Sequence, residues 1–563
     1  MKTALLSSLG KIFPDELLGT RPEAVTVFEN EPLSFQLAYR LEEPGRAAMF
    51  YPVVESALPV TQYRIGYVPV VRACPPVHDG GFDRTDPGLY PDPLYRRKEK
   101  APVENDGRWG QLWAEQGEKQ LLTAVGDAWQ GLWLTVNERG DALTPGEYTV
   151  TVRLYTSENG EEAGTERLSV RVLPGKLPEQ ELLVSNWFHC DCLADHYGVE
   201  MFSPRHFEII GSFLKAAAEH GQNMVLLPAF TPPLDTSIGK ERRTAQLVGV
   251  RVREGKYEFD FTLLKSFVRL ALTCGITHFE HSHLFTQWGA EHAPKIVAEV
   301  DGEEKRIFGW ETDVTAGEYE RFLTAYFAAL RPVLEELGIG DKIYFHVSDE
   351  PDVSHLSRYL AASEILRRAA GDVTFFDAMS HYSIAETGAT DIPVVMETSE
   401  DMEKFIGSGK PYWVYYTGGQ ITGEHCNRLI SCASVRNRML GIMMYAAGAS
   451  GFLHWGYNFW YDMLSHGAFD PNTYPGTYNQ MPGTSFIVYP APDGTAIPSL
   501  RMKVFAEGMR DYRALRLLEE KTSREYVLSF IEKRFGVLRY AYPMTEKALL
   551  DFREELNREI AGE

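Results

Sequence analysis

Cysteine is scarce in this chain. The 563 residues include six cysteines, Cys74, Cys190, Cys192, Cys274, Cys426 and Cys432, which are too sparse for the framework of a disulfide-stabilised fold. The first residues, 1–13, also lack the long apolar core and the small-residue cleavage site of a secretory signal peptide. We therefore expect a reducing compartment, the cytoplasm.

Long apolar runs and an excess of basic residues are missing too. No stretch of about 18 uninterrupted apolar residues occurs, so no segment is expected to insert into a membrane. Lys and Arg number 56 against 78 Asp and Glu, a formal net charge of −22. Because no basic stripe offsets this charge, nucleic acids and anionic membranes are disfavoured as partners. The sequence predicts no particular oligomeric state.

Two common catalytic motifs are absent. No Gly-rich phosphate loop follows a predicted strand, and no Gly-x-Ser-x-Gly turn presents a nucleophilic serine. We therefore expect no cofactor. Aromatic residues, in contrast, make up 12% of the chain, and Trp and Tyr gather near predicted strand ends, where flat apolar faces of a ligand can stack.

Residues 1–178 have the pattern of an all-β domain. Short runs of alternating polarity recur between turn clusters, and a β-sandwich is the fold that such runs favour. The segment 174–178, Pro-Gly-Lys-Leu-Pro, marks the end of this domain. The predicted strands include Ser34–Tyr39, Gln62–Val71, Gly131–Val136, Tyr148–Tyr155 and Leu168–Leu173.

Residues 179–522 alternate between strands and helices. Eight strands in this order predict an α/β fold, a (β/α)8 TIM-like barrel, with a doubly wound sheet as the alternative. Residues 523–563 are predicted to form a helical C-terminal extension. The predicted strands are Leu182–His189, Asn223–Leu227, Thr277–His281, Lys342–Val347, Val373–Asp377, Val394–Glu397, Tyr412–Tyr416 and Gly451–Trp455. The clearest predicted helices are Pro204–His220, Leu263–Cys274, Ala316–Leu337, Ser354–Ala370, Cys426–Ala446 and Arg501–Lys521.

The fourth strand ends at two adjacent acids, Asp349 and Glu350, followed by Pro351. Pro351 cannot donate a ladder hydrogen bond, so the strand stops there. Two carboxyl groups at the carboxyl end of a buried strand are costly unless they are used, and barrels keep their catalytic groups at this end. The alternative is that one of them caps the next helix, a role that Asp352 or Ser354 can fill equally well.

Aromatic and carboxylic side chains gather at the other predicted strand ends. Rings stack on the C–H faces of sugars, and acids and amides bind their hydroxyl groups, whereas phosphorylated substrates require Lys and Arg. A glycan or glycoconjugate is therefore the expected substrate. The predicted substrate-binding residues are Trp187, His283, Trp288, His346, Tyr382, Glu397, Tyr415, Tyr416, Trp455, Asn458 and Trp460.

Two clusters offer possible metal ligands. His281 and His283 have the His-x-His spacing that can present two imidazoles, and His346 and His381 at later strand ends could join them. The run 189–192, His-Cys-Asp-Cys, is the other cluster. Side-chain spacing alone is a weak signal, and we predict no metal.

The Ser-Asp-Glu-Pro run at 348–351 resembles glycoside hydrolase family 123. The resemblance extends to Phe-Leu-His-Trp at 452–455, Ser-Phe-Ile-Val-Tyr-Pro at 485–490, Pro-Ser-Leu-Arg at 498–501 and Glu-Gly-Met-Arg-Asp-Tyr at 507–512. The last three runs are similar to the domain of unknown function 4091, which ends that family's catalytic region. Lys503 and Thr484 stand where acids are expected, and both departures bear on substrate identity.

The resemblance implies a retaining β-N-acetylgalactosaminidase that uses substrate-assisted catalysis. Glu350 would be the general acid/base, and Asp349 would orient the 2-acetamido group and stabilise the oxazolinium ion. Adjacent acids suit these roles, because like charges raise one pKa and leave a protonated acid beside an ionised one. Tyr416 or Tyr382 would donate to the acetamido oxygen, and Trp455 and Trp288 would form the floor of the sugar pocket.

Two alternatives remain at this stage. The chain could hydrolyse a sugar without an acetamido group, with a distant carboxylate such as Glu397 or Glu280 as the nucleophile. It could also be a carbohydrate-binding barrel without activity. Adjacent strand residues face opposite sides, so both acids reach one pocket only if the backbone turns at 349–351.

Overall fold

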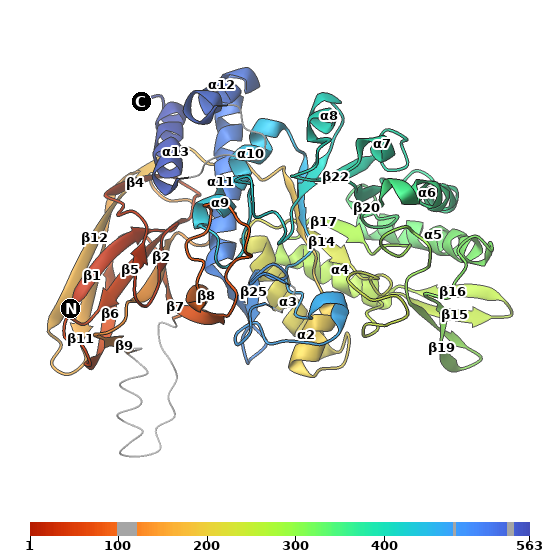
Figure 1. Cartoon of the computed structure of the whole chain (residues 1–563), viewed down its shortest axis with the longest axis horizontal. Helices are drawn as coiled ribbons and strands as arrows, with labels where there is room; N and C mark the ends of the chain where they lie inside the picture. The colour runs from red at the N-terminus through yellow and green to blue at the C-terminus, as the bar shows by residue number, and fades with distance from the viewer. Residues whose placement is uncertain (98–120, 477–479, 537–544) are drawn as a thin grey trace, which may run out of the picture. The chain divides into compact units, whose positions relative to one another are not determined.

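The computed structural model describes residues 1–97, 121–476, 480–536 and 545–563 of a mixed α/β chain. These residues form two compact units (Figure 1). The first unit contains Met1–Gln180, Ile421–Ala446 and Ile497–Glu563, and the second contains Glu181–Gln420 and Ala447–Ala496. The contiguous domain limits at 178 and 522 stay predictions.

Two five-stranded sheets make up most of the first unit. One has the order β1 (Lys2–Ser7), β5 (Leu33–Arg40), β10 (Gln130–Val136), β7 (Val60–Val70) and β8 (Gly88–Arg96). The other has the order β4 (Ala24–Phe28), β12 (Glu162–Leu173), β11 (Gly146–Thr156), β6 (Ala47–Glu55) and β9 (Leu122–Val125). A small hairpin joins β2 (Lys11–Ile12) to β3 (Leu17–Leu18). Every strand predicted in this region is present.

The two sheets share one hydrophobic core because their strands alternate. Leu132, Leu134 and Val136 of β10 point to the same side, and they meet Val150 and Val152 of β11 from the other sheet in one cluster. Such alternation places apolar side chains on one face of each sheet and polar ones on the other.

The helices of the first unit come from its two later segments, 421–446 and 497–563. Ser499, Ser523 and Thr545 cap three of them, because each side-chain oxygen accepts a hydrogen bond from a backbone N–H of the first turn. The helices are α9 (Ser434–Arg438), α11 (Leu500–Lys521), α12 (Arg524–Phe535) and α13 (Glu546–Ala561). The single helix predicted at Cys426–Ala446 is instead α9 followed by α10 (Leu440–Ala447).

The second unit is built on an eight-stranded parallel sheet, and all eight predicted strands are present. In spatial order it contains β20 (Ile343–Phe345), β17 (His278–His281), β14 (Met224–Leu227), β13 (Leu183–Asn186), β24 (Gly451–His454), β23 (Trp413–Tyr415), β22 (Ile392–Met396) and β21 (Phe376–Ala378). The two end strands approach each other. A parallel bridge joins Phe345 to Phe375, so the sheet is a nearly closed barrel.

Helices connect these strands on the outside of the sheet (Figure 1). Apolar side chains such as Phe213 of α3, Phe267 of α4 and Leu323 of α5 are buried against it. The helices are α2 (Cys190–Tyr197), α3 (Pro204–Glu219), α4 (Thr262–Cys274), α5 (Glu318–Leu337), α6 (Leu356–Ala370), α7 (Tyr382–Ala385) and α8 (Met402–Gly407). The helices after the fifth and sixth strands, α7 and α8, are short, and the helix count and topology do not establish a TIM barrel.

An additional four-stranded sheet was not expected. Its order is β16 (Lys256–Asp260), β15 (Gly249–Arg253), β18 (Ile296–Val300) and β19 (Glu303–Phe308). These strands lie in the connections after β14 and β17, and they lengthen the loops on that side of the barrel.

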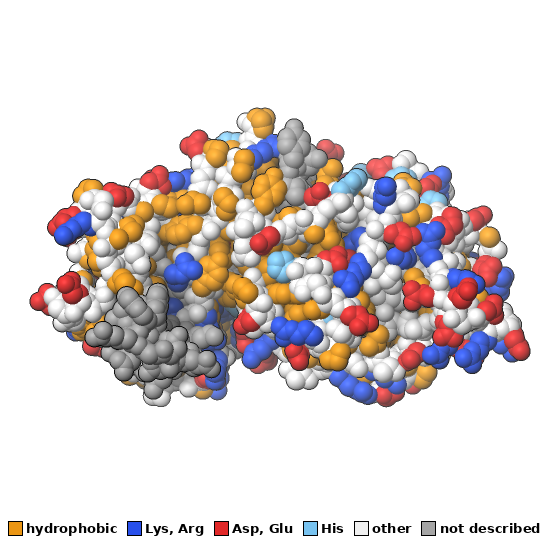
Figure 2. Space-filling view, turned by 90° about the horizontal axis from the view of Figure 1, so that it is seen from below, with side chains coloured by type: hydrophobic (Ala, Val, Ile, Leu, Met, Phe, Trp, Pro, Cys, Tyr) orange, Lys and Arg blue, Asp and Glu red, His pale blue; other side chains and the backbone are white. Residues whose placement is uncertain are grey.

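Charged side chains of both signs are interspersed over the second unit on the face seen in Figure 2. Exposed ion pairs of this unit, such as Arg251–Glu299 at 3.3 Å and Arg368–Glu320 at 2.8 Å, have this mixed character. Within the part of the chain that the structure describes, none of the helices has the length and apolar character needed to span a membrane.

Candidate active site

A cavity of about 360 Å³ opens at the carboxyl ends of the parallel strands. This volume lies within the usual range for ligand pockets, about 300–1,000 Å³. Residues at or after the ends of β13, β14, β17, β20, β21, β23 and β24 line it. The lining consists of Trp187, His189, Leu234, Asp235, Gln287, Trp288, Asp349, Glu350, Ala378, Tyr415, Thr417, Gly418, Gly419, Leu453, Trp455, Phe459, Met463, Gln480, Met481 and Thr484.

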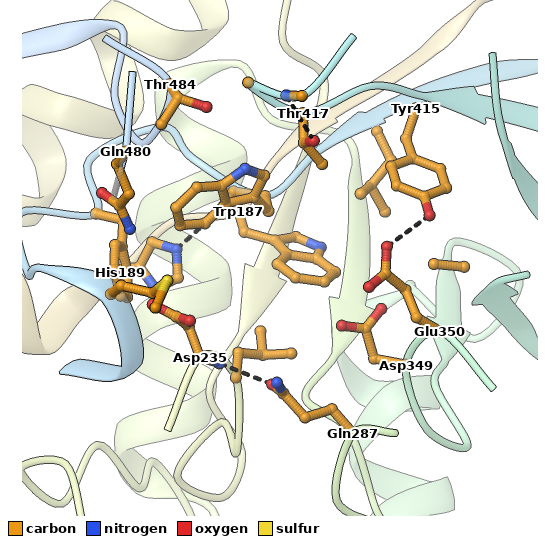
Figure 3. A pocket seen from close by; sticks show the side chains of 18 of the residues that line it. Trp187, His189, Asp235, Gln287, Asp349, Glu350, Tyr415, Thr417, Gln480 and Thr484 are labelled. Atoms are coloured by element: carbon orange, nitrogen blue, oxygen red, sulfur yellow. Dashed lines mark hydrogen bonds between the residues drawn. The ribbon is translucent and has the colours of Figure 1, made fainter. Parts of the chain in front are cut away.

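Asp349 and Glu350 both face this cavity. Figure 3 shows their carboxyl groups side by side, on the opposite side of the cavity from His189 and Asp235. Glu350 has a φ of 46°, in the left-handed region that a residue with a side chain rarely adopts. The turn at Glu350 brings two consecutive side chains to one side, where an extended strand would send them to opposite faces. The geometric condition set by the sequence is therefore met.

Hydrogen bonds on both sides hold this strained segment in place. The Glu350 backbone N–H donates to the carbonyl of Ala378 at 3.1 Å, and the Asp349 carbonyl accepts from the N–H of Trp288 at 2.9 Å. The Ser348 hydroxyl donates to the carbonyl of Thr286 at 2.7 Å. Left-handed backbone of this kind costs on the order of 1–3 kcal/mol and persists only where the surroundings fix it.

The two carboxyl groups have different environments. Burial, together with the negative charge of neighbouring Glu350, raises the pKa of Asp349 well above its ordinary value of 3.8. The sequence placed the retained proton on Glu350. In the unliganded structure the raised pKa is that of Asp349, because Asp349 has the desolvated position. Glu350 accepts a hydrogen bond from the Tyr415 hydroxyl at 2.6 Å.

Directly behind the acid pair lies a buried histidine between two carboxylates. His346 Nδ1 is 3.0 Å from Asp377 and its Nε2 is 3.0 Å from Glu280. Burial alone would lower the pKa of His346, but these two partners raise it to about 9. Glu280 also accepts a hydrogen bond from the indole N–H of Trp187 at 2.8 Å. A line of hydrogen bonds therefore runs from the cavity wall to the strand that carries the acids.

The same histidine belongs to the one group of possible metal ligands found among the described residues, His283, His346 and Asp377. The arrangement does not suit an ion. Both nitrogens of His346 are engaged with carboxylates, and the His283 ring stacks on it with centroids 4.0 Å apart and planes at 13°. Stacked rings direct their in-plane lone pairs alongside each other and not to a common point. His281 is bonded instead to the Tyr326 hydroxyl at 2.7 Å.

The side chains of the run 189–192, the other group of possible metal ligands, also have other partners. Asp191 forms a buried ion pair with Arg242 at 2.8 Å, and burial raises the pKa of the Cys190 and Cys192 thiols well above their ordinary value. His189 contacts the Trp455 carbonyl at 3.0 Å, and burial and Arg242 lower its pKa to about 3, so the ring is neutral.

The structure brings six of the predicted site residues together and places the other seven elsewhere. Those lining the cavity are Trp187, Trp288, Asp349, Glu350, Tyr415 and Trp455. His283 and His346 are buried behind it, and Glu397, Tyr416 and Trp460 are buried without lining it. Asn458 holds the backbone of His189 through its amide, at 2.8 and 3.0 Å, and Tyr382 packs its ring edge on Phe405.

Sequence reasoning missed a third carboxyl group in the cavity. Asp235 follows β14 in a left-handed conformation with a φ of 42°, and its N–H donates to the Gln287 side chain at 2.7 Å. Burial raises its pKa. In the sequence, the only sign of this third carboxyl group is a single acid in a proline-rich loop, 231–235, at the end of the second barrel strand. Gln287, Gln480 and Thr484 were not predicted as lining either, although Thr484 was noted as a departure.

Comparison with protein families finds one family model that matches more than half of the chain. The model described as "Glycoside hydrolase 123, catalytic domain" matches residues 187–518. This range contains the acid pair and every residue that lines the cavity. A search of curated proteins finds no match.

A solved structure shares the fold of the whole chain. A family 123 glycoside hydrolase from Clostridium perfringens superposes with a TM-score of 0.73 at 15% sequence identity, covering 100% of this chain and 97% of that one. A Thermobacillus composti GH10 xylanase has a TM-score of 0.30 at 12% identity, and the match covers 58% of this chain and 97% of that one. A Bacteroides ovatus GH5 xyloglucanase has a TM-score of 0.28 at 9% identity, and the match covers 86% of this chain and 98% of that one.

Proposed function

Because the chain belongs to glycoside hydrolase family 123, and is therefore a glycosidase, we propose that it removes terminal β-linked N-acetylhexosamine, β-GalNAc first, with retention of configuration. The observation that carries the proposal is the left-handed turn at Glu350, which directs two consecutive carboxyl groups into one aromatic cavity. Substrate-assisted catalysis requires two such groups, one at the glycosidic oxygen and one at the acetamido group.

In this mechanism Glu350 protonates the glycosidic oxygen. The acetamido carbonyl oxygen attacks C1 and the C1–oxygen bond breaks, which gives an oxazolinium ion and the released alcohol. Asp349 accepts a hydrogen bond from the acetamido N–H and stabilises the positive charge. Glu350, now ionised, takes a proton from a water molecule that attacks C1, and the acetamido group is regenerated.

Substrate binding has to move the proton of the acid pair. In the free cavity the pKa of Asp349 is the raised one, and two adjacent carboxyl groups titrate as a pair. An acetamido N–H that donates to Asp349 favours the ionised form of that group, so the proton of the pair passes to Glu350. Tyr415 donates a hydrogen bond to Glu350 and so contacts one of the two groups that exchange the proton.

The site also supports exo-action on one terminal sugar. Trp187 and Trp455 supply rings for C–H faces, and Asp235, Gln287 and Gln480 supply hydroxyl-binding groups on the remaining wall. Thr484 lines the cavity where an acid was expected, so it is the position at which a departure from the family's sugar preference would be sought first. The related Clostridium perfringens enzyme is described as acting on glycolipid glycans, and such glycans belong in the substrate panel.

The architecture and setting form part of the same proposal. Eight parallel strands in chain order, joined end to end by the Phe345–Phe375 bridge, support a (β/α)8 barrel. Two five-stranded sheets around one core support an amino-terminal β-sandwich. All six cysteines are free thiols, which fits a cytoplasmic location.

A panel of aryl glycosides tests the function. We expect turnover of β-GalNAc and β-GlcNAc substrates, inhibition by a thiazoline analogue of the oxazolinium ion, and a β-configured first product by NMR.

Glu350→Gln should lower kcat/KM by about 10²–10⁴-fold on glycosides with poor leaving groups, and less on aryl glycosides that need no acid. Asp349→Asn should lower kcat on both kinds. Asp352→Asn, which removes a nearby carboxyl outside the cavity, serves as the control. Wild-type rates in Glu350→Gln would show that another group is the acid.

The alternative is a glycosidase with an enzymatic nucleophile on a sugar that has no acetamido group. Neither Glu280 nor Glu397 lines the cavity, so the carboxyl group available to it is Asp235. Turnover of β-galactosides or β-glucosides together with insensitivity to the thiazoline would support this alternative over the acetamido mechanism, and Asp235→Ala should then abolish that turnover.

A further inference from the structure

The end strands β20 and β21 meet at a seam where the barrel ladder is almost missing. The bridge Phe345–Phe375, with the Phe345 N–H donating to the Thr374 carbonyl at 2.9 Å, and the hydrogen bond from the Glu350 N–H to the Ala378 carbonyl at 3.1 Å join the two sides among the described residues. The acid pair is carried by the segment that leaves β20 at this seam. Between these two points, the backbone N–H groups of Val347 and Ser348 donate to a side chain and not to a strand carbonyl.

A side chain takes the place of the ladder. The carboxylate of Asp377, on β21, accepts hydrogen bonds from the backbone N–H groups of Val347 at 3.1 Å and Ser348 at 3.3 Å. It also accepts from the Tyr359 hydroxyl at 2.7 Å and from His346 at 3.0 Å. Asp377 has no exposed surface. One buried carboxylate thus holds the two peptide groups that come directly before Asp349.

The network continues to the opposite wall of the cavity. His346 links Asp377 to Glu280 of β17, and Glu280 accepts the indole N–H of Trp187 after β13. Glu280 and His346 are fully buried, and Trp187 lines the cavity. A charged histidine between two carboxylates is a strong, directional linkage in a dry interior.

We propose that Glu280, His346 and Asp377 are positioning residues that fix the acid pair and the indole of Trp187 relative to each other across the barrel seam. None of the three touches the cavity, so each acts through Asp349, Glu350 or Trp187. This inference rests on the proposed function, because it assigns the network to the placement of the groups that perform that reaction.

Kinetics of single variants are the first test. Asp377→Asn and His346→Gln should lower kcat by about 100-fold, the size expected when reacting groups move by about 1 Å, with a smaller change in KM. Tyr359→Phe removes one hydrogen bond to Asp377 without changing any charge, and should lower kcat by several-fold in a protein that folds normally. Tyr457→Phe removes a buried hydroxyl that donates to the Phe213 carbonyl at 2.8 Å, outside the cavity and outside this network, so it is the matched control and should keep the wild-type kcat.

A double-mutant cycle separates positioning from a general structural role. On an Asp349→Asn background, adding His346→Gln or Tyr359→Phe should lower kcat by less than threefold, because the group they position has already been disabled. Losses in kcat that multiply independently, or a Tyr359→Phe variant with wild-type kcat, would overturn the proposal. Active-site titration with the thiazoline corrects each rate for the folded fraction.

A crystal structure of Tyr359→Phe or Asp377→Asn gives a readout that does not depend on the substrate. We expect the carboxyl groups of Asp349 and Glu350 to be displaced or disordered while the barrel is retained, and unchanged positions would overturn the inference. If the wild-type protein cleaves no acetamido glycoside, the proposed function fails. The cycle is then measured on whichever glycoside it does cleave, and the network is judged on that result.

Discussion

A single backbone angle decides what the two acids can do. With ordinary strand geometry Glu350 would point away from Asp349, and only one of them would reach the cavity. The left-handed φ of 46° at Glu350 turns it back, and hydrogen bonds from both neighbouring strands stabilise the turn. Strain at a residue that the reaction uses is consistent with selection for chemistry over stability.

Tyr415 is the residue whose role is easiest to isolate. Its hydroxyl donates to Glu350 at 2.6 Å, and a hydrogen bond to a charged group contributes about 1.5–3 kcal/mol. We expect Tyr415→Phe to lower kcat/KM by about 10–100-fold, because Glu350 loses the hydrogen bond that orients its carboxyl group.

The neighbouring tyrosine is a matched control for this prediction. Tyr416 is buried against Phe452 and His454 and does not line the cavity. Tyr416→Phe should change kcat/KM by less than threefold, measured on the same aryl glycoside. Equal losses in the two variants would show that the phenol of Tyr415 has no specific part in the reaction.

Asp349 should reduce stability at neutral pH. An acid whose pKa is raised by folding contributes stability below its unfolded pKa, near 3.8, and loses that contribution as the pH rises through the folded pKa. At pH 7 the unfolded chain gains free energy by releasing a proton that the desolvated position favours keeping, so the acid is unfavourable for folding there. Asp349→Asn should increase the free energy of unfolding at pH 7 by about 1 kcal/mol, in the range typical of relieved active-site strain.

Thermal melts from pH 4 to pH 8 check this prediction. The stability difference between Asp349→Asn and wild type should be largest at pH 7–8 and shrink as the pH falls toward the unfolded pKa. Destabilisation by the asparagine at every pH would mean that Asp349 is held by favourable contacts in its ionised form. The groups near it that also titrate or carry charge are Glu350, His346, Asp377 and Tyr415.

At the scale of elements, the sequence located the barrel strands well because burial leaves a strong composition signal. Runs of apolar and aromatic residues correspond to all eight parallel strands, with ends shifted by a few residues. The inserted sheet was missed for the opposite reason. Its strands β15, β16 and β19 are largely exposed and rich in charge, so they resemble loops.

Prediction of the candidate site from the sequence has the same limit, because residues outside buried strands leave little signal. Trp187, Asp349 and Glu350 could be predicted because they follow buried strands directly. The sequence could not choose between Tyr415 and Tyr416, since alternation fixes their opposite directions but not which one faces inward. Tyr415 shares the interior face with Trp413, and this became clear only from the packing. Asp235 was missed because a loop placed it in the cavity.

The capping alternative for the acid pair can be tested at the next helix. Asp352 caps that turn, since its carboxylate accepts from the Ser354 N–H at 2.9 Å and forms a capping box with His355. Asp352→Ala should lower the free energy of unfolding by about 1 kcal/mol. Its kcat/KM should stay within twofold of wild type, because the Asp352 carboxyl group does not line the cavity.

Urea denaturation and glycoside kinetics on the same preparation check this prediction. If Asp352→Ala loses activity in proportion to Glu350→Gln, the cap and the acid are not separate functions, and the geometry of the loop 349–352 depends on the cap. If neither stability nor activity changes, the turn is held by its other contacts.

At the scale of the whole molecule, part of the family resemblance lies away from the cavity. The run 507–512 belongs to α11, in the first unit, where it takes part in a buried ion network. Asp511 binds Arg438 at 2.7 Å and Arg553 at 2.7 Å, and Arg553 also binds Glu31 at 2.6 Å. The network joins α9, α11 and α13 to the loop between β4 and β5. Lys503, on the same helix, pairs with Glu138 of this unit, so that departure from the family pattern lies outside the cavity.

Breaking this network should cost stability and spare recognition of the substrate. Burial alone would raise the pKa of Asp511, but Arg438 and Arg553 lower it, so the carboxylate is charged and paired at neutral pH. Removing one partner of a buried pair leaves uncompensated charge, which costs about 3–5 kcal/mol. Asp511→Ala should therefore lower the free energy of unfolding by about that amount, with KM unchanged in the fraction that remains folded.

The matched control is an exposed pair of the second unit. Arg251 and Glu299 are half exposed, and Arg251→Ala should cost less than about 1 kcal/mol. Denaturant titrations of both variants give the free energies, and kinetics well below the melting temperature give KM. A change in KM without loss of stability in Asp511→Ala would contradict a purely stabilising role for the network. It would also mean that the run 507–512 on α11 influences the cavity.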